Sequence, residues 1–588
     1  MPAPDPSPTR AELAPGLPYV GALDGLRALA VAAVRLYHGG DAWLPGGFLG
    51  VDVFFVLSGY LITSLLLVEL RGTGRIHLVR FWARRARRLL PAAFLVIGVC
   101  VVVAALFLPA DFARTRADAL ASFAYVNNWH QLLADRSYFA GFARPSLLGH
   151  LWSLAVEEQF YLLWPLALGL VLTRLGRRGA VLLTVVAAVA SALAMALLFT
   201  PGQDPSRVYF GTDTHASGLL VGALLAFAWP LGGTVSEPRP GARRVLDGAA
   251  LGGLAVVLLA MATWQDYDPL VYRGGMLAVA LATAVLVAAV VHPASRVGLA
   301  LGVAPLRWVG RRSYGIYLWH WPVMALSRPD ADLTWNHTLL LALQSALTVA
   351  LAAASYRWVE QPVRTRSAER ALKRWLDRRP PRGRLAFALG ALGALLLGVT
   401  LVAARPVPAP ATPPVATTHS AVALAAPSRV VSAPRVASTG PALAVGASVM
   451  LSAQTALGRH ATVDAAVGRQ AKDLIARLAS YRAAGRLPDR VVVQIGENGP
   501  LYGEDIRSLR LTLRGVRRVV LVNVRVTRRW NQEVNARLAE LAGQWPQARV
   551  ADWYAASAGA GLLYDDGTHP TPRGRRIYAR VVERALRD

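Results

Sequence analysis

The chain has 588 residues, of which 54% are hydrophobic and 17% are charged, and its mean hydropathy is +0.38. This balance excludes an ordinary soluble enzyme and indicates a polytopic membrane protein with a soluble portion. The net charge is +28 and the single cysteine is Cys100, which excludes a disulfide framework and a thiolate metal cluster. The polar, proline-rich start MPAPDPSPTR precedes an apolar run without a small-residue cleavage site, so we expect no cleavable signal peptide.

About eleven hydrophobic segments are long enough to cross a bilayer, which takes roughly 17–25 residues. They lie near residues 21–38, 48–70, 89–109, 147–171, 180–199, 216–231, 245–263, 275–291, 313–327, 337–357 and 385–404.

Positive charge predicts how these segments are oriented. Residues 71–88 contain seven arginines and no acid, and residues 364–384 contain nine basic residues against two acidic ones. Basic blocks beside apolar spans are typical of the cytoplasmic side, which favours them over nucleic-acid binding, the competing interpretation. The alternation predicts a cytoplasmic N-terminus in a plasma or inner membrane, with everything after the last span outside.

The C-terminal quarter has a different composition and periodicity. Residues 405–440 are rich in Pro, Ala, Ser and Thr without periodicity, as in an extended linker. From residue 442 onward, ALAVGAS, RVVVQIG, RRVVLVNVRV and ARVADWY read as buried parallel strands that alternate with amphipathic helices. We therefore expect a cytoplasmic tail, a membrane domain, a basic segment with a further span, a linker and an α/β domain, at 1–18, 19–365, 366–404, 405–440 and 441–588.

The first predicted span carries four ionisable residues on one side. Asp24, Arg27, Arg35 and His38 fall within about 80° of arc on a helix that turns 100° per residue. Such a stripe must face protein or water, because ionisable groups are costly in lipid. The plainer interpretation is a structural Asp24–Arg27 pair, with Arg35 and His38 in the outer headgroup zone.

Polar residues in four other stretches argue for a shared cavity. Alone, each stretch is explained by an aromatic belt, a satisfied polar pair or close glycine packing. Together they indicate a chamber lined from several helices. The residues concerned are Asp52 and Ser58, Trp152, Ser153, Glu157 and Glu158, Asp213 and His215, and His320.

The order of motifs resembles membrane acyltransferase family 3, over roughly residues 19–365. The motifs are Arg27-x10-His38, GGFLGVDVFFVLSGYLIT, FWARRARRLLPA, LWSLAVEEQFYLLWP, SYGIYLWHWPV and VEQPVR. The family comprises bacterial O-acyltransferases that act on surface polysaccharides, peptidoglycan or antibiotics. One departure is His215, which stands where the resemblance implies an arginine.

The resemblance implies a role for several residues. His38 is expected to be a general base or a transiently acylated group, since imidazole titrates near neutral pH. Arg27, with Arg84 and Arg85, is expected to bind the phosphates of an acyl-CoA donor, with acetyl-CoA foremost. Glu157 or Glu158 could orient the His38 imidazole, and no metal is expected.

The C-terminal domain resembles SGNH hydrolases. Ser448 follows a strand in ALAVGAS, and Asp566-x-x-His569 lies near the C-terminus, which is the chain order of that family's triad. The resemblance implies an oxyanion hole from the Ser448 amide, Gly468 and Asn498. Ala447 stands where the family has an aspartate that shapes the turn, which leaves the activity of the domain in question. If the resemblance were misleading, Ser448 and His569 would merely cap local structure.

We therefore expect an O-acyltransferase, foremost an O-acetyltransferase. It would move an acyl group from cytoplasmic acyl-CoA to hydroxyls of a surface polysaccharide or peptidoglycan, with the bilayer as its other partner. A transporter or flippase of a glycan precursor is the alternative, although the internally repeated halves it predicts are not found in the sequence. The C-terminal domain could then be an esterase or a glycan-binding module.

Overall fold

The computed structural model describes most of the chain. The described residues are 17–39, 44–109, 111–134, 145–201, 204–231, 240–266, 268–328, 335–377, 442–458, 461–466, 468–526, 530–564 and 567–587. The predicted span at 385–404, the predicted linker at 405–440 and the predicted triad residue Asp566 lie outside these ranges. The chain divides into two compact units, Met1–Phe107 with Ala117–Ala371, and Leu108–Arg116 with Leu372–Asp588.

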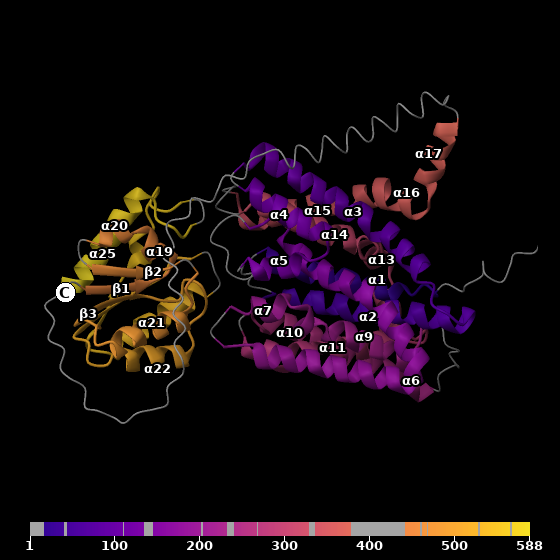
Figure 1. Cartoon of the computed structure of the whole chain (residues 1–588), viewed down its shortest axis with the longest axis horizontal. Helices are drawn as coiled ribbons and strands as arrows, with labels where there is room; N and C mark the ends of the chain where they lie inside the picture. The colour runs from indigo at the N-terminus through magenta and orange to yellow at the C-terminus, as the bar shows by residue number, and fades with distance from the viewer. Residues whose placement is uncertain are drawn as a thin grey trace, which may run out of the picture. The chain divides into compact units, whose positions relative to one another are not determined.

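The described part of the first unit is helical (Figure 1). Its longer helices are α1 (Gly21–His38), α2 (Gly50–Thr73), α3 (Leu78–Phe107), α4 (Phe112–Phe123), α6 (Trp152–Leu198), α9 (Ser217–Ala228), α10 (Pro240–Thr263), α11 (Met276–Val290), α14 (Ser313–Leu326), α15 (His337–Ser355) and α17 (Ser367–Asp377). Shorter turns connect them: η1 (Gly47–Leu49), α5 (Asn127–Leu133), η2 (Gly149–Leu151), α7 (Ser206–Phe210), α8 (Thr212–His215), η3 (Val271–Gly275), α12 (Arg296–Leu301), α13 (Ala304–Gly310), η4 (Tyr356–Glu360) and α16 (Gln361–Arg364).

Six helical stretches among the described residues are long and apolar enough to cross a membrane. They are Gly47–Thr73, Leu78–Phe107, Gly149–Leu198, Arg243–Thr263, Val271–Val290 and Thr338–Arg364. The third covers nearly all of the predicted segments 147–171 and 180–199, which are separated by a break at Gly176 with φ 65° and ψ −171°. The protein is therefore a membrane protein with several apolar helices, and six of the expected eleven or so spans meet this length and composition among the described residues.

Helix α1 lies inside the helical unit, not at its edge. It packs against α2, α12, α13 and α14, and Figure 1 shows α1 and α2 running side by side. Asp24 and Arg35 are buried, and Arg27 and His38 are partly buried. The polar stripe thus faces protein, as its cost in lipid predicts.

Glycines allow α2 and α9 to approach closely. A Cβ built on Gly59 would lie 1.9 Å from the carbonyl oxygen of Leu219, and one built on Gly222 would lie 2.1 Å from that of Val56. Without a hydrophobic drive between helices in lipid, such small residues bring backbones into contact. This contact holds α2, which carries Ser58, in place.

The second unit contains a parallel sheet, as predicted. Its strands β1 (Ala442–Gly446), β2 (Ala461–Ala465), β3 (Arg490–Gln494), β4 (Arg518–Val522) and β5 (Ala548–Ala551) lie in the order β2-β1-β3-β4-β5. The helices are α19 (Ser448–Ser452), α20 (Gln454–Leu457), α21 (Ala471–Ala483), α22 (Gly503–Thr512), α23 (Asn531–Gly543), α24 (Trp553–Ala556) and α25 (Pro572–Arg587).

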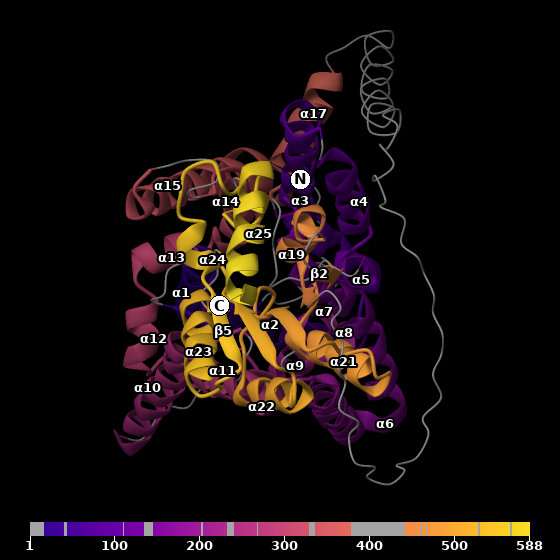
Figure 2. The same ribbon diagram turned by 90° about the vertical axis from the view of Figure 1, so that its left-hand side faces the viewer.

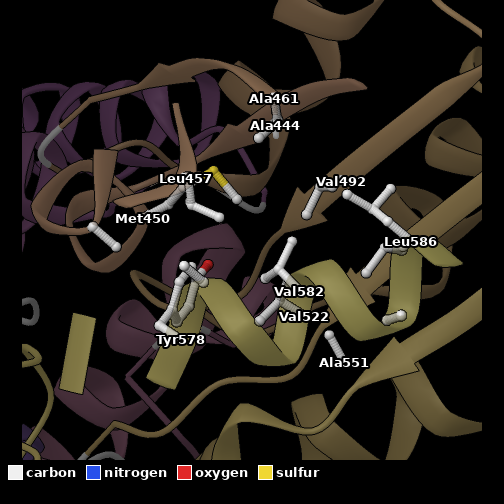
Figure 3. Packing of buried hydrophobic residues seen from close by; sticks show 14 of the residues in the cluster. Ala444, Met450, Leu457, Ala461, Val492, Val522, Ala551, Tyr578, Val582 and Leu586 are labelled. Atoms are coloured by element: carbon white, nitrogen blue, oxygen red, sulfur yellow. The ribbon is translucent and has the colours of Figure 1, made fainter. Parts of the chain in front are cut away.

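Helices cover both faces of this sheet (Figure 2). Figure 3 shows α25 laying Tyr578, Val582 and Leu586 on one face, against Val492 of β3 and Ala551 of β5. Burial on both faces explains why the central strands β3 and β4 read as nearly continuous runs of valine. The chain goes from β1 to β2 on one side and then crosses back to β3 on the other side of β1. The carboxyl end of β1 is therefore a switch point, where open α/β sheets bind ligands.

Candidate active sites

The helical unit contains a partly open cavity of about 100 Å³ that is lined from eight elements. It contains five guanidinium groups and two carboxylates. The charged and polar lining residues are Arg27 (α1), Ser58 (α2), Arg85 and Arg88 (α3), Ser153, Glu157 and Tyr161 (α6), Arg311 (after α13), Ser313, Tyr314 and Tyr317 (α14), Tyr356 and Glu360 (η4), and Gln361 and Arg364 (α16).

Two guanidinium nitrogens in this cavity have no hydrogen-bond partner among the described residues. The Nε atoms of Arg27 and Arg85 are buried and make no hydrogen bond in the described part of the chain. The Arg85 guanidinium lies 4.2 Å above the Tyr161 ring. Buried donors without partners are rare in folded proteins, so these groups suit an anionic substrate.

The carboxylates on α6 do not reach His38. Glu157 accepts a 2.6 Å hydrogen bond from Ser58 and lines the cavity beside Arg27, while Oε1 of Glu158 is buried without a partner. The expectation that Glu157 or Glu158 orients His38 is wrong. Arg27 and His38 are about 16 Å apart along α1, and Glu157 lies at the Arg27 end.

His38 instead contacts the histidine of the SYGIYLWHWPV motif. Its Nδ1 lies 3.1 Å from Nε2 of His320 on α14, and its ring stands edge-on to Trp321 at 4.7 Å. One turn before His320, the Tyr317 hydroxyl lies 2.5 Å from Ser153 Oγ, and both residues line the cavity. The cavity wall therefore adjoins the histidine pair.

The remaining members of the stripe have separate partners. Asp24 accepts a 2.8 Å hydrogen bond from the Tyr19 hydroxyl, and Arg35 donates to Gln344 Oε1 on α15 at 3.1 Å. Arg35 is buried, so the headgroup interpretation does not describe it.

The two predicted donor-binding arginines behave differently. Arg85 lines the cavity, whereas Arg84 does not line it and forms a 3.3 Å ion pair with Glu69. Neighbouring helical residues point 100° apart, whereas Arg85 and Arg88 at i, i+3 share a face. That spacing was the signal for Arg88, which the sequence interpretation missed together with Arg364 of VEQPVR.

His215 has a structural partner of its own. Its Nε2 lies 3.0 Å from Asp52 Oδ1, its Nδ1 lies 2.7 Å from the Tyr209 carbonyl oxygen, and both side chains of the pair are buried. A histidine thus meets Asp52 where the motif implies an arginine.

In the second unit, Ser448 and His569 meet. His569 Nε2 lies 2.9 Å from Ser448 Oγ, although the two residues are 121 positions apart in the chain. Ser448 begins α19 directly after β1, at the switch point of the sheet. A base within hydrogen-bond reach of a hydroxyl is the geometry that nucleophilic catalysis requires.

The two other predicted oxyanion-hole residues belong to loops that meet at this edge. Gly468, after β2, has a left-handed φ of 74°, and the next residue, Arg469, donates to the Gly446 carbonyl oxygen at the end of β1. The Asn498 amide donates to the Arg469 carbonyl oxygen at 3.0 Å. Arg469 therefore links the ends of β1 and β2 to the loop after β3.

A buried acid that the sequence interpretation did not single out lies beside the Ser448 turn. Glu497 accepts a hydrogen bond from the Val449 amide at 3.4 Å, and burial raises the pKa of Glu497 to about 8. Ala447 is also buried. Glu497, in the loop after β3, thus supplies a carboxyl group at this turn, which Ala447 itself cannot supply. The described residues contain no group of three or more His, Cys, Asp or Glu placed to hold a metal.

A helical membrane region with an arginine-lined cavity, joined to an α/β domain with a serine–histidine pair, is the organisation of a membrane acyltransferase. The sequence model of the acyltransferase domain, Acyl_transf_3, matches residues 20–357, so the chain belongs to this acyltransferase family.

Characterised relatives match over nearly the whole chain. Peptidoglycan O-acetyltransferase OatA of Listeria monocytogenes is 36% identical, over 96% of this chain and 97% of the relative. O-acetyltransferase OatA of Staphylococcus aureus is 33% identical, over 97% and 96% respectively. Among solved structures, the C-terminal catalytic domain of Streptococcus pneumoniae peptidoglycan O-acetyltransferase A, with a methylsulfonyl adduct, matches at 25% identity and a TM-score of 0.24, over 25% of this chain and 92% of that one.

Proposed function

We propose that this protein transfers acetyl groups from cytoplasmic acetyl-CoA to hydroxyl groups of peptidoglycan outside the membrane. The relatives named peptidoglycan O-acetyltransferase support the acceptor. The observation that carries the donor assignment is the arginine-lined cavity on the inner half of α1, whose unpartnered guanidinium nitrogens suit the phosphates of CoA.

The cavity and the histidine pair have different roles at the two ends of α1. Arg27, Arg85 and Arg88 hold the phosphates at one end, and the pantetheine arm carries the thioester the remaining distance of about 16 Å towards His38. There His38 takes the proton of an attacking hydroxyl as that oxygen bonds to the thioester carbonyl carbon. The carbon–sulfur bond then breaks, and the CoA thiolate receives the proton.

The charge pattern supports an orientation with the N-terminus and residues 71–88 in the cytoplasm. About eleven crossings, the last at 385–404, would place residues 441–588 outside. Helices of the structure coincide with the predicted segments up to residue 357.

The second unit completes the transfer in this proposal. Ser448 Oγ, deprotonated by His569, attacks the acetyl ester formed at His38, and the alkoxide released when that ester bond breaks takes the proton. A glycan hydroxyl then attacks the Ser448 ester in the same way, which acetylates the glycan and regenerates the serine hydroxyl. Asp566 would orient His569, and the Ser448 amide, Gly468 and Asn498 would stabilise the oxyanion.

Full-length protein reconstituted with acetyl-CoA and soluble glycan strands tests this function. We expect acceptor-dependent release of the CoA thiol and a glycan mass increase of one acetyl group, both lost in His38→Ala. Thiol release without glycan modification, or a His38→Ala variant at the wild-type rate, would overturn the proposal.

A further inference from the structure

Arg469 in the second unit is held by both its side chain and its backbone. Its guanidinium donates to the Gly446 carbonyl oxygen at 3.3 Å, to the Asp464 carbonyl oxygen at 2.7 Å and to the Asp464 carboxylate at 2.8 Å. Its backbone carbonyl oxygen accepts the Asn498 amide at 3.0 Å. One residue is thus bonded to the ends of β1 and β2 and to the loop after β3.

The Asp464 carboxylate fixes the guanidinium. The pairing of β1 with β2 puts Asp464 beside Val445, one residue before the carbonyl group that Arg469 reaches. The same carboxylate accepts from Arg477 at 2.6 Å and from the Tyr481 hydroxyl at 2.8 Å, both on α21. The side chains of Arg469 and Asp464 are each 13% exposed, whereas that of Arg477 is 49% exposed. A guanidinium that makes several charge-assisted bonds in this setting has a defined position.

Both predicted oxyanion donors besides the Ser448 amide adjoin Arg469. Gly468 directly precedes it and has a left-handed φ of 74°. The Asn498 amide nitrogen carries two hydrogens, and one of them goes to the Arg469 carbonyl oxygen. The other is the hydrogen that the proposed oxyanion hole requires. A fixed Arg469 therefore restricts both the backbone beside Gly468 and the rotation of the Asn498 amide.

We infer that Arg469 is a positioning residue that holds Gly468 and Asn498 where they stabilise the oxyanion at Ser448. This inference rests on the proposed oxyanion hole of the second unit. When Ser448 Oγ attacks an acetyl carbonyl group, negative charge develops on the carbonyl oxygen, and donors must lie about 2.7–3.1 Å from it. Arg469 acts through these two donors and not on the substrate. A misplacement of about 1 Å can cost about 10²-fold in rate.

Arg477 supplies a matched control. It pairs with the same carboxylate, but in the described part of the chain it makes no hydrogen bond to Gly446 or Asn498. The measurement is kcat/KM for hydrolysis of 4-nitrophenyl acetate by the full-length protein, after subtraction of the rate of Ser448→Ala. Arg469→Gln should lower it by about 10²-fold. Arg477→Gln should stay within about threefold of wild type, because exposed ion pairs contribute little.

A double variant separates positioning from a general loss of structure. Asn498→Ala alone should cost about 10²–10³-fold, as the loss of one oxyanion donor does. If Arg469 acts through the oxyanion donors, adding Arg469→Gln to Asn498→Ala should cost about tenfold or less, since residues that act together are not additive. A purely structural role would lower the rate by the same factor in both backgrounds.

The outcomes distinguish this inference from the proposed function. Wild-type hydrolysis in Ser448→Ala or in Asn498→Ala would overturn the proposed chemistry of the second unit and the inference with it. If those two variants are impaired, equal effects of Arg469→Gln and Arg477→Gln would overturn the inference alone, as would additive losses in the double variant. If Arg469→Gln does not fold, Arg469→Lys replaces it, because an ammonium group keeps the charge beside Asp464 without the fork of donors. We then expect a loss of at least about tenfold with the same non-additivity, and a wild-type rate would overturn the inference.

Discussion

Arg84 and Arg85 are neighbours in the chain but belong to different environments. Arg85 lies above the Tyr161 ring in the cavity, whereas Arg84 pairs with Glu69, which also lies 3.1 Å from His77. Arg84 and Arg85 therefore supply a matched test of the donor site, because the same substitution at either position removes one positive charge from α3.

Arg85→Gln should raise the KM for acetyl-CoA by about 10–100-fold, since hydrogen bonds to charged groups contribute about 1.5–3 kcal/mol. Arg84→Gln should change it by less than about threefold. Initial rates of thiol release at varied acetyl-CoA measure both. Equal effects of the two substitutions would contradict a phosphate site at Arg85.

Ser448 and Ser452 provide a second matched pair. Both belong to α19, but Ser452 Oγ donates to the Val449 carbonyl oxygen at 2.7 Å, whereas Ser448 Oγ contacts His569. Ser448→Ala should reduce hydrolysis of 4-nitrophenyl acetate by the full-length protein by at least about 10³-fold. Ser452→Ala should leave it nearly unchanged. Retained hydrolysis in Ser448→Ala would assign the activity elsewhere and leave the second unit as a binding module.

The buried acid Glu497 predicts a pH dependence for the second unit. Its pKa is raised from 4.5 to about 8, so between these values the native state holds a proton that the unfolded state has released. Stability therefore decreases as pH rises through this window and levels off above it.

Hydrogen exchange of the peptide around β1 and α19 in the full-length protein, corrected for intrinsic rates, measures this effect. Protection should be lower at pH 8.5 than at pH 6, with the difference reduced in Glu497→Gln, which keeps an acceptor for the Val449 amide. A wild-type pH dependence that persists unchanged in Glu497→Gln would show that another group titrates.

The contact between α2 and α9 predicts a position-specific effect of a single methyl group. Gly59→Ala would place Cβ against the Leu219 carbonyl oxygen, and overpacking costs about 1–3 kcal/mol. Gly98→Ala on α3 meets open space and is the control. Thermal stability in detergent, followed by size-exclusion chromatography, should fall for Gly59→Ala and stay constant or rise for Gly98→Ala. Equal stability of the two variants would mean that the helices can separate at little cost.

Patterns local in the chain were enough to predict much of the architecture. Runs of apolar residues indicated the membrane helices, and valine-rich runs indicated the parallel strands, because burial imposes composition directly on each element. The spacing of Asp24, Arg27, Arg35 and His38 likewise showed that α1 lies within protein, since helical periodicity alone determines which residues share a face.

Partners across helices were not predictable in this way. The sequence favoured Glu157 or Glu158 beside His38 and placed Arg84 with Arg85, whereas packing put His320 against His38 and Arg84 on Glu69. The rotation and depth of each helix decide which side chains meet, and these depend on contacts such as that of Gly59 with Leu219. The sequence by itself thus determined which elements form and which faces are buried, while only the tertiary structure decided which residues share a site, because that depends on the simultaneous packing of segments hundreds of residues apart.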